Sequence, residues 1–310
     1  MAKMWIGAAA GTVLNRRIVR WAAAVFLCAG AAVLCMVLFR AKTRELQTKR
    51  ELLDLWEAKN YNDAYKKSRE GLSRRPLDSL FLTVNGFTSY QAAVSQIDQA
   101  GAFAYVEECI WSLRKALLGR NSDRNGRIRY VLGKAYYIKG PEYADLAVKY
   151  LEEAKAASCE AGDLNEYLGL AYAALKDYPR SVEALTGSLS SGEEGSDLLL
   201  LSIAQSYMGM EDWDSARTYL IRCAEVSRDE DVVIKSRLLL SRALRGAGDT
   251  GGAETALGWI LENVENAEAA YELGEIYAER GETIRARAAW RRAYRADRNY
   301  GPAQIRLNTM

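Results

Sequence analysis

The residues that this chain lacks set the first limits on its chemistry. None of its 310 residues is a histidine. This excludes Ser-His-Asp and Cys-His nucleophilic sites, His-ligated zinc or haem, and histidine-based pH switches. Cys28 and Cys35 lie in an apolar segment, and Cys109, Cys159 and Cys223 are too far apart to suggest a metal site or a disulfide framework. Any catalysis would have to use carboxylates, lysine, tyrosine or cysteine.

Two remaining sequence patterns, a glycine-rich run and pairs of acidic residues, are of kinds that can bind or act on a small molecule. The glycine run Gly246-x-Gly248-x-x-Gly251-Gly252 has no Gly-Lys-Ser/Thr and follows a predicted helix, not a strand, so we interpret it as a turn. Adjacent acidic residues diverge on a helix surface, and we interpret three such pairs as solvated faces: Glu107-Glu108, Glu152-Glu153 and Glu193-Glu194. We therefore predict no enzyme activity, no cofactor, no metal site and no small-molecule substrate.

The basic residues are concentrated at the N-terminus. Residues 1–44 hold seven of the 42 basic residues and none of the 40 acidic residues, so residues 45–310 carry a net charge of −5. Binding to nucleic acid needs a basic face that matches the phosphates. The acidic balance of the main part of the chain argues against a nucleic-acid partner.

An apolar segment near the N-terminus is predicted to cross a membrane. Residues 21–39 include no charged residue, and a helix of this length extends about 28 Å, close to the roughly 30 Å hydrocarbon core. Basic residues flank the segment on both sides, and Trp21 begins it. A cleaved signal peptide is the alternative, but Leu38-Phe39-Arg40 offers no small-residue cleavage site. We predict a short basic tail over residues 1–20 and a retained transmembrane helix over 21–39.

Charge gives little indication of how this segment is oriented in the membrane, because the numbers of basic residues before and after it are nearly equal. A short tail followed by one span and a large domain is typical of a signal anchor that exports the domain. We therefore expect a single-pass bacterial inner-membrane protein with its main domain in the periplasm, and a cytoplasmic orientation stays open.

The connection between the span and the main domain is predicted to be helical. The sequence has no glycine between Gly30 and Gly71, and its first proline is Pro76. Residues 40–58 are almost all strong helix formers, unlike a flexible linker. The membrane helix should therefore continue into the first helix of the domain.

The rest of the chain is repetitive, and the pattern is clearest over residues 270–293, with Leu273-Gly274, Tyr277, Gly281, Ala286, Trp290 and Ala293. The same register recurs at Leu132-Gly133 with Tyr136 and at Leu168-Gly169 with Tyr172. Repeat units begin near residues 45, 79, 126, 162, 197, 234 and 267. This pattern resembles the tetratricopeptide repeat, a helix-turn-helix unit of about 34 residues.

The resemblance implies an all-α fold, a right-handed α-solenoid of about seven helix pairs that follows the single transmembrane helix. The solenoid covers residues 40–300, and residues 301–310 form a short C-terminal capping segment. In each unit, the small residue of the first helix should let the second helix approach closely, and the aromatic residues should fill the space between them.

The family also implies a binding surface, because one face of each first helix lines a concave groove. Carried onto this sequence, that rule gives a partner-binding set of Phe87, Tyr90, Arg127, Tyr130, Lys134, Tyr137, Lys235, Arg242 and Arg245. Aromatic and basic side chains of this kind favour acidic peptide segments. The carboxylate clamp of chaperone-binding relatives is absent, since Lys134 and Phe87 stand where that clamp has asparagine.

The resemblance therefore implies a membrane-anchored scaffold that binds partner proteins or peptides through its groove, in a bacterial cell-envelope assembly. The alternative is a non-catalytic regulatory or tethering subunit of a membrane enzyme complex. A carboxylate-based hydrolase would require a pocket with two convergent acidic side chains.

Overall fold

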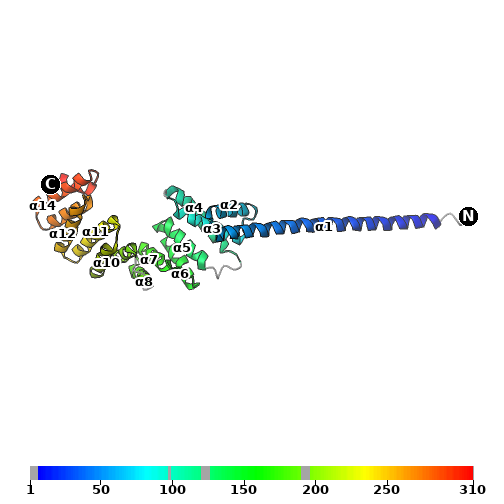
Figure 1. Cartoon of the computed structure of the whole chain (residues 1–310), viewed down its shortest axis with the longest axis horizontal. Coiled ribbons are helices and arrows are strands. Elements are labelled where there is room, and N and C mark those ends of the chain that lie inside the picture. The colour runs from blue at the N-terminus through cyan, green and yellow to red at the C-terminus, as the bar shows by residue number, and fades with distance from the viewer. Residues whose placement is uncertain (1–5, 97–98, 120–125, 190–195, 310) are drawn as a thin grey trace. The chain divides into compact units, whose positions relative to one another are not determined.

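The computed structural model describes residues 6–96, 99–119, 126–189 and 196–309, with the side chains of Trp21, Leu27 and, except for residues 99 and 100, the described residues from Gly30 onward. These residues form fifteen α-helices and one short 3₁₀ turn, and no strand occurs among them. The predicted all-α class is confirmed. The chain divides into two compact units, Met1–Gly119 and Arg120–Met310 (Figure 1).

The described residues of the first unit form four α-helices, α1 (Ile6–Glu57), α2 (Tyr61–Arg74), α3 (Ser79–Val94) and α4 (Gln99–Ala116). Helix α1 is a single helix of 52 residues, drawn in blue in Figure 1. It runs without a break from the apolar segment through residues 40–57, as predicted for the connection to the domain. Its last turns belong to the first unit's core, where Leu52 is fully buried with Ala64 and Phe81.

The predicted membrane segment, residues 21–39, lies within α1. Among the described residues, we find no helix with the length and hydropathy required to span a bilayer. The side chains of residues 1–20, 22–26 and 28–29 lie outside the described residues, and seven of these residues belong to the predicted span, 21–39. The transmembrane assignment therefore stays a prediction from the sequence.

The second unit is a succession of helix pairs, each helix packing against the next along the chain. The helices are α5 (Gly126–Lys139), α6 (Ala144–Ala156), α7 (Leu164–Ala174), α8 (Tyr178–Leu189), α9 (Asp197–Gly209), α10 (Trp213–Val226), α11 (Glu230–Gly246), α12 (Thr250–Asn263), α13 (Ala267–Glu279), α14 (Thr283–Ala296) and α15 (Gly301–Asn308). The 3₁₀ turn η2 (Pro141–Tyr143) precedes α6. We call the first helix of each pair the A helix and the second the B helix.

Within a pair, a glycine of the A helix lies directly against a large side chain of the B helix. A Cβ atom placed on Gly133 would lie 2.5 Å from Leu151, and one on Gly274 would lie 2.4 Å from the Trp290 indole. Both Leu151 and Trp290 are fully buried. The glycine is therefore required for the close approach of the two helices, and no larger residue fits without displacement.

The turn between the two helices of a pair is also repeated. Its central residue has a positive φ of 61° at Lys176, 60° at Glu211, 84° at Gly248 and 76° at Gly281. The next residue's N–H then donates to the carbonyl oxygen five residues earlier, as in Asp249 to Leu244 at 2.8 Å. This is the Schellman arrangement that ends a helix. The glycine run at residues 246–252 thus includes the turn between two helices, which confirms the prediction from the sequence.

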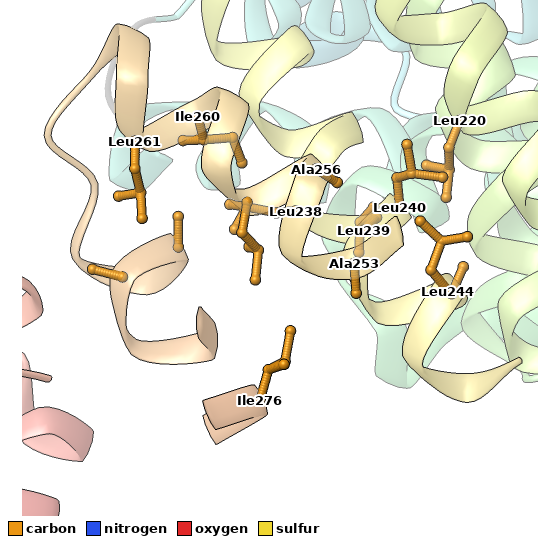
Figure 2. Packing of buried hydrophobic residues seen from close by; sticks show 14 of the residues in the cluster. Leu220, Leu238, Leu239, Leu240, Leu244, Ala253, Ala256, Ile260, Leu261 and Ile276 are labelled. Carbon is orange, nitrogen blue, oxygen red and sulfur yellow. The ribbon is translucent and has the colours of Figure 1, made fainter. Parts of the chain in front are cut away.

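Contacts between pairs supply much of the core. One buried apolar cluster joins residues of α10, α11, α12 and α13, including Leu220, Leu240, Ile260 and Ile276 (Figure 2). Since each repeat is thin, its apolar surface is buried largely by its neighbours.

We predict opposite effects on stability from alanine at two helical glycines. Gly274→Ala should lower the free energy of unfolding by about 1–3 kcal/mol, because the added methyl group overlaps the buried indole of Trp290. Gly258→Ala should raise it by about 0.5–1 kcal/mol, because alanine loses less backbone entropy than glycine when the helix forms. At this α12 position the added methyl group meets no atom within 4 Å beyond the adjacent helix backbone. Urea unfolding followed by circular dichroism measures both, and a stabilised Gly274→Ala variant would contradict the packing described here.

Candidate partner-binding surface

The A helices of the second unit lie against one another in chain order. Contacts join α5 to α7, α7 to α9, and α9 to α11. Ion pairs between side chains link α11 to α13 and α13 to α15. We call the shared face of these six helices the A-helix surface. It holds seven of the nine sequence-predicted site residues; Phe87 and Tyr90 belong to the first unit.

Lys134 on α5 is held between two repeats. Its ammonium group donates to Asp163 Oδ2 at 2.7 Å and to the Tyr130 hydroxyl at 2.9 Å. It also lies 4.2 Å from the centre of the Tyr167 ring, and Tyr130 donates a hydrogen bond to Asp163. Lys134 is only 9% exposed. Its charge is therefore already matched by Asp163 at the start of the next repeat.

The protonation states in this cluster follow from burial and hydrogen bonding. Burial, reinforced by the hydrogen bond to Asp163, raises the pKa of Tyr130 to about 12. Burial also opposes ionisation of Asp163, but hydrogen bonds from Lys134 and Tyr130 outweigh it and hold the pKa of this carboxyl below its ordinary value. Burial and the nearby charge of Asp163 raise the pKa of Glu166. The Asp163 carboxyl is therefore ionised at neutral pH, where it pairs with Lys134.

An open pocket of about 640 Å³ adjoins this cluster. It is formed by the start of α5 and the connection between α6 and α7, and its lining includes Arg127, Tyr130, Cys159 and Asp163. Arg127 is exposed, and its side chain makes no hydrogen bond or ion pair with any residue that the structure describes. Burial raises the pKa of the Cys159 thiol, which argues against a reactive thiolate there. The pocket therefore offers one available guanidinium group.

The other aromatic residues predicted for the surface pack against neighbouring helices. Tyr137 meets Tyr167 edge to face, with ring centres 5.6 Å apart. In the first unit, Phe87 on α3 lies 5.8 Å from the Trp56 ring on α1, and Tyr90 is half-buried. Each of these rings is partly covered, so only its remaining edge is open to a partner.

A second charged cluster joins α11 to α13. Arg242 Nε donates to Glu272 Oε1 at 2.6 Å, and the same guanidinium group pairs with Glu268. Ser241 donates to the other oxygen of Glu272 at 3.1 Å. Glu272 is 6% exposed, so this carboxylate depends on Arg242 and Ser241 for its hydrogen bonds.

The same pairing continues along the surface. Arg245 pairs with Glu279 of α13, and Glu275 of α13 accepts from Arg306 Nε of α15 at 2.9 Å. Lys235 at the start of α11 is exposed and has no ion-pair partner among the described residues. The predicted surface is therefore divided: Lys134, Arg242 and Arg245 hold neighbouring repeats together, whereas Arg127 and Lys235 are available.

The acidic pairs are less exposed than the sequence suggested. Glu108 accepts hydrogen bonds from Tyr65 at 2.6 Å and from Asn85 at 3.1 Å, and Glu153 accepts one from Arg129 at 3.1 Å. The prediction of solvated faces holds only in part: Glu153 stays 40% exposed, whereas Glu108 is half-buried because helix packing brings donors from α2 and α3 to it. Glu193 and Glu194 lie outside the described residues. Within the described part of the chain, no acidic or cysteine cluster could hold a metal ion.

Comparison with known proteins agrees with this architecture. Residues 238–301 match the sequence profile of the tetratricopeptide repeat family. The chain is similar in structure to the C-terminal part of a TPR repeat-containing protein from Cytophaga hutchinsonii, with a TM-score of 0.60 and 14% identity, covering 84% of this chain and 99% of that one. No curated protein matches the chain in sequence.

Two further solved structures are similar. A tetratricopeptide repeat protein from Parabacteroides merdae ATCC 43184 has a TM-score of 0.50 and 17% identity, covering 84% of this chain and 98% of that one. MamA from Desulfovibrio magneticus RS-1 has a TM-score of 0.50 and 15% identity, covering 57% of this chain and 97% of that one. The fold is that of a tetratricopeptide repeat protein, and residues 238–301 carry the family's sequence pattern.

We predict unequal costs from removing two basic residues of α11. Arg242→Met should lower the free energy of unfolding by about 1–3 kcal/mol, because it leaves the buried Glu272 carboxylate without its cation. Lys235→Met should change it by less than about 0.5 kcal/mol, because this side chain is exposed. Chemical denaturation of both variants tests this, and equal effects would show that the ion pairs between repeats do not contribute to stability.

We also predict a pH-dependent contribution from Asp163. Its pKa is lowered in the folded protein, so its ionised form stabilises the fold above the unfolded pKa of about 3.9. This stabilisation is lost as the pH falls through the lower, folded-state pKa. Wild type should therefore exceed Asp163→Asn in stability at neutral pH, and the difference should shrink in acid. Urea unfolding across this pH range measures it, and a difference that grows in acid would contradict the assignment.

Proposed function

We propose that this protein is a membrane-anchored, non-catalytic scaffold that binds partner proteins or peptides on its A-helix surface, in a bacterial cell-envelope assembly. The observation that carries the proposal is the layer of successive A helices with an open pocket at the α5–α7 end. Such a layer presents side chains from several repeats to one extended segment.

The available groups suggest how a partner would be recognised. Arg127 lies in the pocket with its guanidinium group unpaired among the described residues, and Tyr130 beside it is fixed by Lys134 and Asp163. A guanidinium group binds carboxylates with two parallel hydrogen bonds. We therefore favour an acidic side chain or a chain-terminal carboxylate of the partner at this pocket.

Membrane anchoring is the second part of the proposal. It is supported by the uncharged sequence of residues 21–39 and by the exposure of apolar side chains in α1, such as Leu34, which is 59% exposed, and Phe39, which is 70% exposed. An exposed apolar stretch of this kind needs to be covered by lipid or protein. We propose that the domain lies on the periplasmic side of the inner membrane.

Site-specific photo-crosslinking in cells tests the binding surface. A photoreactive amino acid in place of Arg127 or Ile138 on α5 should give discrete crosslinked products, whereas the same group at Arg217 or Arg222 on α10 should not. These control positions are exposed on a B helix. Products from α10 but not from α5 would overturn the assignment. Capture of one stoichiometric enzyme from α5 would favour the regulatory-subunit alternative over a general scaffold.

Charged substitutions test the anchor. Gly30→Arg with Leu34→Arg should release the full-length protein from the membrane fraction, because arginine near the centre of a span opposes insertion by about 2.5–3.5 kcal/mol per residue. Thr43→Arg with Gln47→Arg adds the same charge beyond the predicted span and should leave the protein in the membrane fraction. Retention of both variants would exclude residues 21–39 as the anchor.

A further inference from the structure

The outer face of α14 carries exposed arginines that the A-helix surface does not use. The helix buries Ala286, Ala289, Trp290 and Ala293. Its opposite face exposes Arg291 and Arg295, and Arg298 follows just after the helix ends. A spacing of four residues places Arg291 and Arg295 on one side, about 6 Å apart along the axis. We call Arg291, Arg295 and Arg298 the arginine ridge.

Other arginines of the same helix are engaged in the fold. Arg285 pairs with Glu282 at 2.6 Å and with Glu254 at 3.1 Å, and Arg292 pairs with Glu265 at 3.1 Å. By contrast, none of the three ridge guanidinium groups makes a hydrogen bond or ion pair with any described residue, although the backbone carbonyl of Arg298 accepts a hydrogen bond from Gln304. The helix therefore contains two kinds of arginine, one engaged within the repeat and one left in solvent.

Stability of the helix does not account for the ridge. Like charges four residues apart on a helix destabilise it. Arg295 in the last turn does interact favourably with the helix dipole, but this explains only one of the three residues. Exposed apolar groups accompany the ridge, with Ile284 86% exposed and Tyr294 39% exposed. Together these side chains form a charged and partly apolar strip that the fold itself does not need.

We propose that the arginine ridge, with Ile284 and Tyr294, is a second docking surface that binds an acidic segment of a partner protein. Arginine binds carboxylates through charge-assisted hydrogen bonds, and the flanking apolar side chains add contact area. This surface lies on a B helix and is separate from the A-helix surface, so the inference does not depend on the function proposed above.

Acidic neighbours favour a narrow protein segment over a broad polyanion. Glu282 and Asp297 stand at the two ends of α14, and Glu265 lies beside it as the partner of Arg292. Glu282 and Glu265 are paired with Arg285 and Arg292, but Asp297 lies between Arg295 and Arg298 with no ion-pair partner among the described residues. A nucleic acid or an anionic membrane that covered the ridge would lie against this carboxylate and be repelled, whereas a single peptide can contact the arginines beside it.

The test uses the full-length protein in detergent and a fluorescent helical peptide with three glutamates spaced four residues apart. The triple variant Arg291→Glu, Arg295→Glu and Arg298→Glu should weaken binding by at least about tenfold in fluorescence anisotropy. The matched control is Lys149→Glu, Arg217→Glu and Arg222→Glu, which makes the same charge change on exposed positions of α6 and α10. It should stay within about twofold of wild type.

Several outcomes would overturn the proposal. Equal losses in both triple variants would show a general charge effect, and undiminished binding of a peptide with glutamine in place of glutamate would remove the role of charge. Stronger ridge-dependent binding of a single-stranded oligonucleotide or of phosphatidylglycerol vesicles would replace the proposed partner class. Circular dichroism melting checks that the variants are folded, and the milder variant Arg291→Gln, Arg295→Gln and Arg298→Gln should show an intermediate loss.

Discussion

The close approach of two helices within each repeat is the constraint on which the rest of the structure depends. Where the A helix has glycine, as at Gly133 and Gly274, the facing B-helix side chain fills the space that a Cβ atom would occupy. The pair that results is only two helices thick. It cannot bury its apolar surface alone, so neighbouring repeats must cover it, as they do in the cluster that joins α10 to α13.

Stacking the repeats also decides the electrostatics of the A-helix surface. Neighbouring A helices bring a basic residue of one repeat beside an acidic residue of the next, as in Lys134 with Asp163 and Arg242 with Glu272. A partly buried ion pair must satisfy both charges to offset the cost of taking them out of water. These residues therefore stabilise the interface between repeats. A partner can contact only the charged residues that take no part in that interface.

The same distinction between engaged and available charge applies to the B helices. Arg285 and Arg292 of α14 are paired with acidic residues around them, whereas the side chains of the ridge residues, on the same helix and just after it, remain in solvent. On the A-helix surface and on α14 alike, the residue type alone does not show whether a charged side chain is open to a partner. The neighbouring helices decide whether a guanidinium group contributes to the fold or remains open to another molecule.

The sequence by itself determined the all-α class, the turn at residues 246–252 and the unbroken helix through residues 40–57, because these depend on local propensity and on spacing within one unit. It is also the source of the membrane-span prediction. Only the tertiary structure decided which predicted site residues are available. Lys134 reaches Asp163 and Arg242 reaches Glu272 across 29 and 30 positions of the chain, and Glu108 receives its donors from two other helices. Such pairings depend on side-chain directions on packed helices, which the periodicity of one repeat does not specify.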